Sequence, residues 1–304
     1  MYDKNDPRAS LASAATAGAP PQTGLIAEPQ LGLFYEEPPA LDDDSGRTWF
    51  HRGCNFVTAW SEAAPRGSFA RTGQIDEYAV LLPERGHSAR ITWNGAAVDV
   101  PGYSVAFVPP GDSRIEMPDG GPLTRLVTVR SADLAARASN GDAYAAGRAH
   151  IPPFTPWPEP SAGWNVRHYS LDVAKKPGRF GRIFRCTTFM VNFLDANEGP
   201  RDTTRLSPHH HDDFEQLSLA VAGSFTHHLR WPWTIDMADW RDDRHDHVRS
   251  PSAYVIPPPV IHTTRAMDAG TNQLVDIFCP PRLDFSMKPG WVLNADDYPM
   301  PTDA

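Results

Sequence analysis

Proline and glycine occur so often along this chain that long regular helices have little room to form. The 304 residues include 31 prolines and 22 glycines. Proline lacks a backbone donor and glycine favours turns, so both interrupt regular structure at short intervals. Helix-periodic stretches are scarce, whereas short alternating apolar stretches are frequent. The sequence therefore predicts an all-β fold of sandwich or barrel type, long enough for one large domain or two ordinary ones.

A run of three histidines at positions 209–211 opens the most informative segment of the chain. In an extended backbone, residues two apart point the same way, so His209 and His211 are predicted to converge with Glu215 on the same side. Another histidine, His262, follows three prolines at the end of a second predicted strand. Imidazoles and carboxylates are ligands of divalent transition metals. We therefore predict that these four residues bind one divalent ion.

These residues resemble the two sequence motifs of the cupin superfamily. The first motif is His-x-His, three or four residues, a glutamate and later a turn glycine, and the second is Pro-x-Gly-x-x-His. The matching positions here are His209, His211, Glu215, Gly223 and His262. The chain departs from the family at Pro259, which replaces the motif glycine, and at Ala266, where an asparagine is common. It also has one extra residue before Gly223.

The resemblance implies a metal ion held by three imidazoles and one carboxylate, with two coordination positions left open. Fe(II), Mn(II), Ni(II) and Zn(II) all accept such ligands, and the sequence does not choose among them.

An internal repeat indicates that the module is duplicated. Residues 76–82 parallel residues 214–219, and residues 105–111 parallel residues 253–259. Such a repeat is typical of duplication of a whole β module. The chain therefore resembles a bicupin, which has two cupin (jelly-roll) β-barrel domains in one chain.

The amino-terminal copy lacks the metal ligands of the family. The three histidine positions fall at Arg71, Gly73 and Arg114, and arginine has no lone pair for a cation. We predict that this copy is a structural partner of the metal-binding one. Two alternatives remain: Arg71 and Arg114 bind an anion inside the barrel, or Glu77 is their internal ion-pair partner.

The repeat and a proline-rich segment together predict the domain organisation. Residues 1–30 are predicted to form a flexible arm, and residues 31–150 the degenerate amino-terminal barrel. Residues 151–165 are predicted to be a proline-rich linker, because proline at this density favours an extended crossing. Residues 166–304 are predicted to form the metal-binding carboxy-terminal barrel.

Some side chains outside the motifs could act beside the metal ligands. The candidates are His227, His228, Arg182 and Arg185. The two histidines lie on opposite faces of one predicted strand, as do the two arginines, so one of each pair faces the barrel interior. An interior arginine would favour a small carboxylate or enolate substrate. The alternatives are a hydrogen-bonded core histidine and a surface or ion-paired arginine. Gln216 is predicted to point away from Glu215 and to be structural.

Composition restricts the partners and the compartment. The net charge of −9 and the absence of a basic patch argue against nucleic-acid binding. No apolar run in the sequence approaches the length of a membrane span, and the amino terminus lacks the apolar core of a signal peptide. Three widely spaced cysteines indicate free thiols in a reducing compartment. We expect a cytoplasmic protein that binds a small-molecule substrate and could form a homodimer.

Among cupins with this ligand set, the resemblance implies first a dioxygenase-type oxidoreductase acting on a small enediol, keto or phenolic substrate. A non-redox isomerase, lyase or decarboxylase of a carbohydrate or organic acid is the alternative. A non-catalytic, small-molecule-binding bicupin is the third hypothesis. That hypothesis predicts loss of the metal ligands from both copies, so their retention in one copy favours an enzyme.

Overall fold

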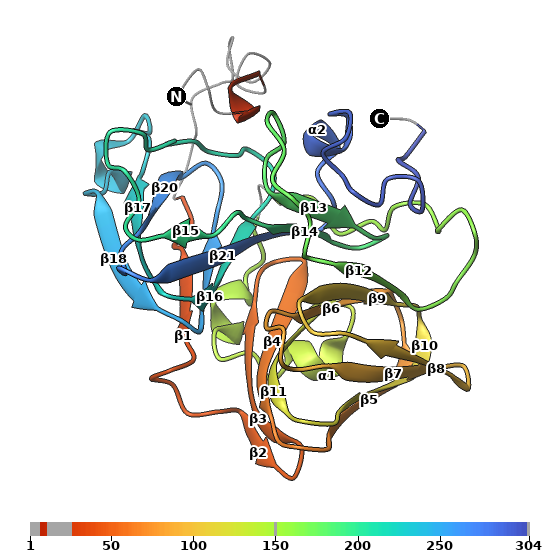
Figure 1. Cartoon of the computed structure of the whole chain (residues 1–304). Helices are drawn as coiled ribbons and strands as arrows, with labels where there is room; N and C mark the ends of the chain where they lie inside the picture. The colour runs from red at the N-terminus through yellow and green to blue at the C-terminus, as the bar shows by residue number, and fades with distance from the viewer. Residues whose placement is uncertain (1–6, 11–25, 149–150, 303–304) are drawn as a thin grey trace.

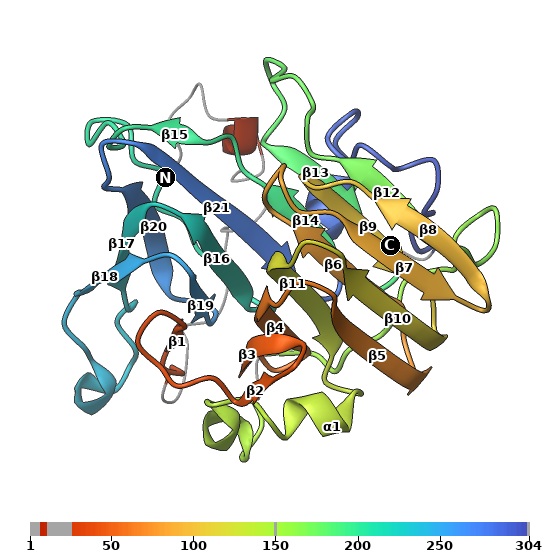
Figure 2. The same ribbon diagram turned by 60° about the horizontal axis from the view of Figure 1, so that its bottom comes forward.

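The computed structural model describes residues 7–10, 26–148 and 151–302, and it consists of two β-sandwich modules lying side by side (Figures 1 and 2). Each module is a jelly roll of two sheets that do not close into a continuous barrel. The helical elements described are single turns. They are η1 (Pro7–Ser10), α1 (Ala132–Ala135), η2 (Gly141–Tyr144), η3 (Met237–Asp239) and α2 (Leu283–Ser286). The predicted all-β class is therefore confirmed.

The amino-terminal module consists of a seven-stranded and a four-stranded antiparallel sheet. The large sheet has the order β12-β9-β6-β11-β4-β3-β2 and the small sheet the order β5-β10-β7-β8. The strands of the large sheet are β2 (Leu41–Asp43), β3 (Gly46–Arg52), β4 (Phe56–Ala63), β6 (Tyr78–Leu82), β9 (Ser104–Val108), β11 (Gly121–Thr128) and β12 (Arg167–Ser170). Those of the small sheet are β5 (Gly67–Gln74), β7 (Ala89–Trp93), β8 (Ala96–Val100) and β10 (Gly111–Met117).

The carboxy-terminal module repeats this plan with a seven-stranded and a three-stranded sheet. The large sheet has the order β1-β19-β16-β21-β14-β13, with β15 also paired to β21, and the small sheet has the order β18-β17-β20. The strands of the large sheet are β1 (Gln30–Leu33), β13 (Arg182–Arg185), β14 (Met190–Phe193), β15 (Asn197–Glu198), β16 (Gln216–Ala222), β19 (Ser252–Ile256) and β21 (Thr271–Phe278). Those of the small sheet are β17 (Ser224–Arg230), β18 (Arg244–Arg249) and β20 (Ile261–Ala266).

The two modules exchange edge strands. β1 precedes the amino-terminal module in the sequence but pairs with β19 of the carboxy-terminal one, Gln30 opposite Val255. β12 follows the proline-rich segment but pairs with β9 of the amino-terminal module, Arg167 opposite Phe107. The predicted boundaries at residues 30 and 166 therefore do not coincide with the sheets, because each edge strand crosses to the other module (Figure 1).

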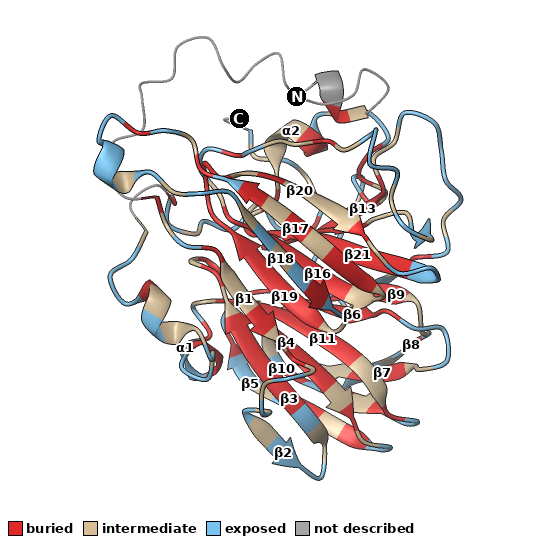
Figure 3. Cartoon of the chain, turned by 90° about the vertical axis from the view of Figure 1, so that its left-hand side faces the viewer, coloured by how far each residue is buried: buried red, intermediate tan, exposed pale blue. Residues whose placement is uncertain are grey.

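A shared hydrophobic core joins the two large sheets. Side chains alternate along each strand, so Ala79 and Leu81 of β6 and Leu217 and Leu219 of β16 all face this core. The central strands of both large sheets are buried along most of their length (Figure 3). The opposite faces of the same strands point into the two sandwiches. There β6 contributes the apolar Val80 and Leu82, whereas β16 contributes polar side chains.

The segment predicted as a flexible arm is ordered where the structure describes it. Residues 7–10 form η1 near α2, at the carboxy-terminal module (Figure 1). Ile26 belongs to a hydrophobic cluster with Tyr254, and β1 is part of a sheet. Residues 1–6 and 11–25, which complete the predicted arm, lie outside the described residues. Within the described chain, no helix combines the length and apolar character needed to cross a membrane.

Candidate metal centre

The three predicted histidine ligands converge inside the carboxy-terminal module. His209 and His211 lie in the segment before β16, and His262 lies in β20. One candidate ligand atom from each lies within 4.8 Å of the others. Backbone hydrogen bonds hold His209 and His262 opposite each other, with N–O distances of 3.0 and 2.8 Å. The fold therefore brings together residues that are 53 positions apart.

The protonation of the three imidazoles fits a metal ion. Burial holds the pKa of His209 and His211 well below the ordinary value and lowers the pKa of His262 to about 4, so all three are neutral at pH 7. The Nδ1–H of His262 donates to the carbonyl of Val260 at 2.9 Å. Its Nε2 is buried and has no hydrogen-bond partner among the described residues. A buried nitrogen lone pair beside two further imidazoles is the arrangement that a divalent ion requires.

Gln216, rather than Glu215, faces the histidines. The Nε2 of His211 lies 3.2 Å from the Oε1 of Gln216. The amide nitrogen of Gln216 donates to Ser218 Oγ and to Asp276 Oδ1, both at 3.0 Å, which fixes Oε1 toward His211. Two ligands that bind one ion at about 2.1 Å and at a right angle lie roughly 3.0 Å apart. The amide oxygen of Gln216 is therefore placed to be the fourth ligand.

The prediction that Glu215 shares the histidine face is wrong. Its carboxylate accepts hydrogen bonds from the backbone N of Cys54 at 2.5 Å and from the hydroxyl of Tyr144 at 3.2 Å, and Arg148 lies 4.0 Å away. These partners all belong to the amino-terminal half of the chain. Burial raises the pKa of this carboxyl group. Glu215 thus points across the module interface and away from the three imidazoles.

A matching contact runs in the opposite direction from the amino-terminal module. Glu77, which precedes β6 as Glu215 precedes β16, accepts from the backbone N and the hydroxyl of Thr187, both at 2.9 Å. It also accepts from the hydroxyl of Tyr298 at 2.7 Å. Each module therefore inserts a buried glutamate that holds a hairpin turn of the other module. This pseudosymmetry indicates that Glu215 is the structural counterpart of Glu77.

The prediction for Glu215 is wrong because of the local backbone conformation. Residues 212 and 213 form a bend between His211 and β16, so the two-residue alternation does not continue from the histidines into the strand. A sequence signal for the correct residue exists. Four residues separate Gln216 from His211 and six separate it from Gly223, so the extra residue counted before Gly223 from Glu215 is absent when counted from Gln216. Gly223 occupies the expected turn with a φ of 80°.

The two histidines of β17 do not join the centre. His227 is buried, hydrogen-bonds to Thr264 Oγ1 at 2.9 Å and stacks on Tyr254 with a centroid distance of 4.6 Å. Burial lowers its pKa to about 3. His228 lies on the outer face, where its Nδ1 is 2.9 Å from the Nδ1 of His245. These contacts agree with the alternative of a structural histidine inside the sandwich.

The two candidate arginines are buried but bind backbone oxygens away from the histidines. Arg182 donates to the carbonyls of Leu171 and Leu194 at 2.8 and 2.7 Å. Arg185 donates to the carbonyl of Tyr298. Neither is among the described residues that line the cavity at the histidine cluster. Both are buried, and backbone carbonyls rather than carboxylates accept these hydrogen bonds, so the alternative of a surface or ion-paired arginine is also wrong for the described residues.

The equivalent positions of the amino-terminal module point elsewhere. Arg71 donates to Gln74 and forms an ion pair with Asp133 at 2.5 Å. Arg114 is exposed and donates to Ser68. The hypothesis that both arginines hold an anion inside the barrel is therefore wrong, because Arg114 lies on the outer face of β10. Glu77 is not their ion-pair partner either, since Thr187 and Tyr298 occupy its carboxylate.

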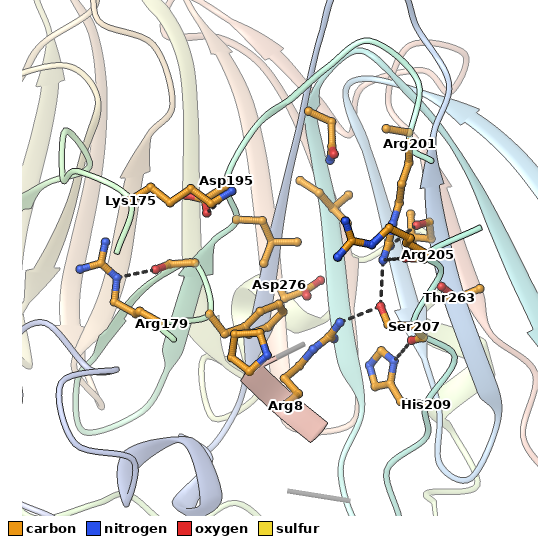
Figure 4. Close-up of a pocket in the computed structure, with 18 of the residues that line it drawn as sticks. Arg8, Lys175, Arg179, Asp195, Arg201, Arg205, Ser207, His209, Thr263 and Asp276 are labelled. Carbon is orange, nitrogen blue, oxygen red and sulfur yellow. Dashed lines mark hydrogen bonds and ion pairs between the residues drawn. The ribbon is translucent and has the colours of Figure 1, made fainter. Parts of the chain in front are cut away.

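The histidine cluster opens on a cavity of about 600 Å³ (Figure 4). His209, Gln216, His262 and Asp276 line it, and burial raises the pKa of Asp276 to about 6. Sequence reasoning missed Asp276, although a lone carboxylate in the apolar strand β21 was a usable signal. It also missed Arg8, which reaches the cavity from η1.

Of the comparisons with known proteins, the one with solved structures supports the fold. No protein-family profile matches the sequence, and no curated protein matches it. The structure is similar to AerE from Microcystis aeruginosa, with a TM-score of 0.53 and 8% identity, over 84% of this chain and 99% of AerE. It is also similar to oxalate decarboxylase from Lactobacillus farciminis, solved as a formate complex, with a TM-score of 0.52 and 12% identity over 87% and 88% of the two chains. A variant of Bacillus subtilis oxalate decarboxylase is similar with a TM-score of 0.50 and 11% identity, over 84% of this chain and 78% of that protein.

At 8–12% identity, these likenesses show a shared fold over most of this chain. The chain therefore has a fold of two jelly-roll modules, and its carboxy-terminal module holds the histidine cluster.

Proposed function

We propose that this protein is a bicupin and a metal-dependent enzyme that acts on a small organic acid by non-redox carbon–carbon cleavage, as a decarboxylase or related lyase. The observation that carries the proposal is the position of the histidine cluster at a cavity lined by an excess of cationic side chains. Among the described lining residues, six are lysine or arginine and three are aspartate. The chain as a whole has a net charge of −9, so this concentration of positive charge is local.

Four residues of the site would bind the metal ion, and the other lining residues would contact the substrate. His209, His211, His262 and the amide oxygen of Gln216 would hold a divalent ion. Such an ion polarises a substrate oxygen and stabilises negative charge that develops in the reaction. Because all four ligand groups are neutral, the full charge of the ion would remain available to an anionic substrate. Asp276 orients Gln216 through its amide nitrogen.

The fold neighbours are consistent with this proposal, since two of them are named oxalate decarboxylases. Their sequence identity to this chain is 11% and 12%, which supports a shared fold only. The proposed reaction therefore rests on the residues of the site.

A dioxygenase acting on an enediol, keto or phenolic substrate is the second candidate. The apolar side of the cavity favours it, because Phe180, Leu194, Phe225 and Leu274 line the same space and could pack against an unsaturated or aromatic ring. The two candidates predict different requirements for oxygen.

The first experiment tests the ion. We expect wild-type protein reconstituted with Mn(II), Fe(II), Ni(II) or Zn(II) to retain one ion per chain after desalting, measured by plasma mass spectrometry. His211→Ala and His262→Ala should lose most of it, whereas His228→Ala, on the outer face of β17, should retain it. Equal metal content in all three variants and the wild type would contradict the metal centre.

The second experiment tests the reaction. Each reconstituted protein is incubated with a panel of small organic acids and phenols under strict anaerobiosis and in air, while CO₂ release and oxygen consumption are followed. Undiminished CO₂ release without oxygen supports the decarboxylase. Turnover that occurs in air alone, with oxygen consumed, supports the dioxygenase. Retention of metal without turnover on any substrate favours a binding protein.

A further inference from the structure

Residues about 200 positions apart meet in the cavity at the histidine cluster. Arg8, in η1, is only 8% exposed although it lies near the amino terminus. Its guanidinium lies 4.1 Å from the centre of the Phe180 ring and donates to the Oγ of Ser207 at 2.8 Å. Figure 4 shows Arg8 directed toward Ser207 and His209. The amino-terminal segment therefore supplies a buried positive charge to the carboxy-terminal module.

Ser207 connects this charge to the histidine cluster. Its hydroxyl oxygen accepts from Arg8 and also from Arg201, at 2.8 and 2.9 Å. Its carbonyl oxygen lies 3.0 Å from the Nδ1 of His209, one of the predicted ligands. Two guanidinium groups thus meet one hydroxyl immediately beside the metal centre.

Arg201 has a structural role. It also donates to the carbonyls of Thr264 and Arg205, which fixes the loop before His209. Arg8 lines the same cavity as His209 and His262. A guanidinium in this position can bind a carboxylate with charge-assisted hydrogen bonds.

We propose that Arg8 is a specificity-determining residue that binds a carboxylate of the substrate while another substrate oxygen binds the metal ion. This inference rests on the proposed function, and it identifies the substrate class as a small acid with an oxygen donor adjacent to its carboxylate. The amino-terminal segment is then part of the active site rather than a free arm. Cation–π contact with Phe180 and the bond to Ser207 hold the guanidinium in place for an incoming anion.

The test uses the full chain loaded with Zn(II), which has no redox chemistry of its own. Oxalate is the probe, and oxamide is its neutral analogue of the same shape. Calorimetric titration compares wild type, Arg8→Gln, Arg8→Lys and Arg205→Gln, which removes another charge from the lining of the same cavity. We expect Arg8→Gln to weaken oxalate binding by about tenfold or more with unchanged zinc content, Arg8→Lys to be intermediate, and Arg205→Gln to change it by less than about threefold. Oxamide binding should not respond to Arg8→Gln.

The outcomes separate the two proposals. If the wild type takes up zinc but Arg8→Gln binds oxalate as tightly as wild type, the role of Arg8 is overturned and the metal centre stands. Equal losses in Arg8→Gln and Arg205→Gln also overturn it, because general charge would then explain the binding. If the wild type takes up no zinc, or the zinc-loaded wild type binds no oxalate, the inference fails, and in the first case the proposed function fails with it.

Discussion

At the scale of single residues, the identity of the fourth ligand depends on which of two neighbours faces inward. Glu215 and Gln216 are both buried, but only Gln216 contacts a histidine of the cluster. Glu215 instead binds the backbone of Cys54 across the module interface. The carboxylate that the motif suggests is thus used for assembly, and an amide takes its place beside the imidazoles.

Separate substitutions of these two residues should distinguish a loss of metal affinity from a loss of stability. We expect Gln216→Leu to weaken Zn(II) binding by at least about tenfold, because it removes an oxygen ligand and leaves Asp276 without an amide donor. Glu215→Gln should keep the metal affinity but lower the free energy of unfolding by about 1–3 kcal/mol, since a charged acceptor of the buried Cys54 amide becomes a neutral one. Competition with a chromophoric chelator and urea denaturation measure the two effects. A larger loss of zinc in Glu215→Gln than in Gln216→Leu would contradict the assignment.

His51 should make the protein sensitive to acid independently of the metal. Burial lowers its pKa from 6.5 to about 4 in the folded state. Below pH 6.5 the unfolded chain therefore binds a proton that the folded chain does not, so stability falls as the pH decreases and the loss levels off below about pH 4. From pH 7 to pH 5 this residue should remove about 2 kcal/mol. His51→Gln should lose correspondingly less stability over this range, measured by urea denaturation, and an unchanged pH dependence would argue against the prediction.

At the scale of elements, hairpin turns and edge strands connect the modules. The turn between β3 and β4 receives Glu215, and the turn between β13 and β14 receives Glu77. β1 and β12 each complete a sheet of the other module. The same construction therefore occurs twice, related by the internal repeat.

Gly53 is required in the first of these turns because the packing leaves no space for a side chain. A Cβ at this position would lie 2.4 Å from the Phe56 ring and 2.7 Å from Glu215 Oε2. We expect Gly53→Ala to destabilise the protein by about 1–3 kcal/mol. Gly86→Ala is the control, since nothing lies within 4 Å of its added Cβ. Thermal melts of both variants measure the difference, and equal melting temperatures would show that the turn can move aside.

At the scale of the whole molecule, the two jelly rolls share one core and two exchanged strands. Large apolar side chains of both modules, among them Trp60, Phe107, Phe193 and Leu217, belong to the same hydrophobic cluster. Separating the modules would expose this cluster and unpair β1 and β12. The predicted cytoplasmic location and the predicted homodimer stay predictions.

The shared core predicts cooperative unfolding of the described chain. Scanning calorimetry should give a single transition whose calorimetric and van't Hoff enthalpies agree, because neither module can unfold without exposing the core of the other. The control is the metal-free protein, where the transition should shift to lower temperature and remain single. Two resolved transitions in the metal-free protein would show that the modules are independently stable.

The sequence by itself determined the fold class, the duplication and the three histidines. These features depend on local properties: proline and glycine spacing, strand alternation and the distance between motifs. The tertiary structure decided which neighbour of the histidines faces the cavity, because the bend at residues 212–213 breaks the alternation that sequence reasoning assumed. It also decided where β1, β12 and Arg8 lie. Those placements depend on contacts between residues at least 60 positions apart, such as Arg8 with Ser207 and Arg167 with Phe107, and no local pattern encodes such contacts.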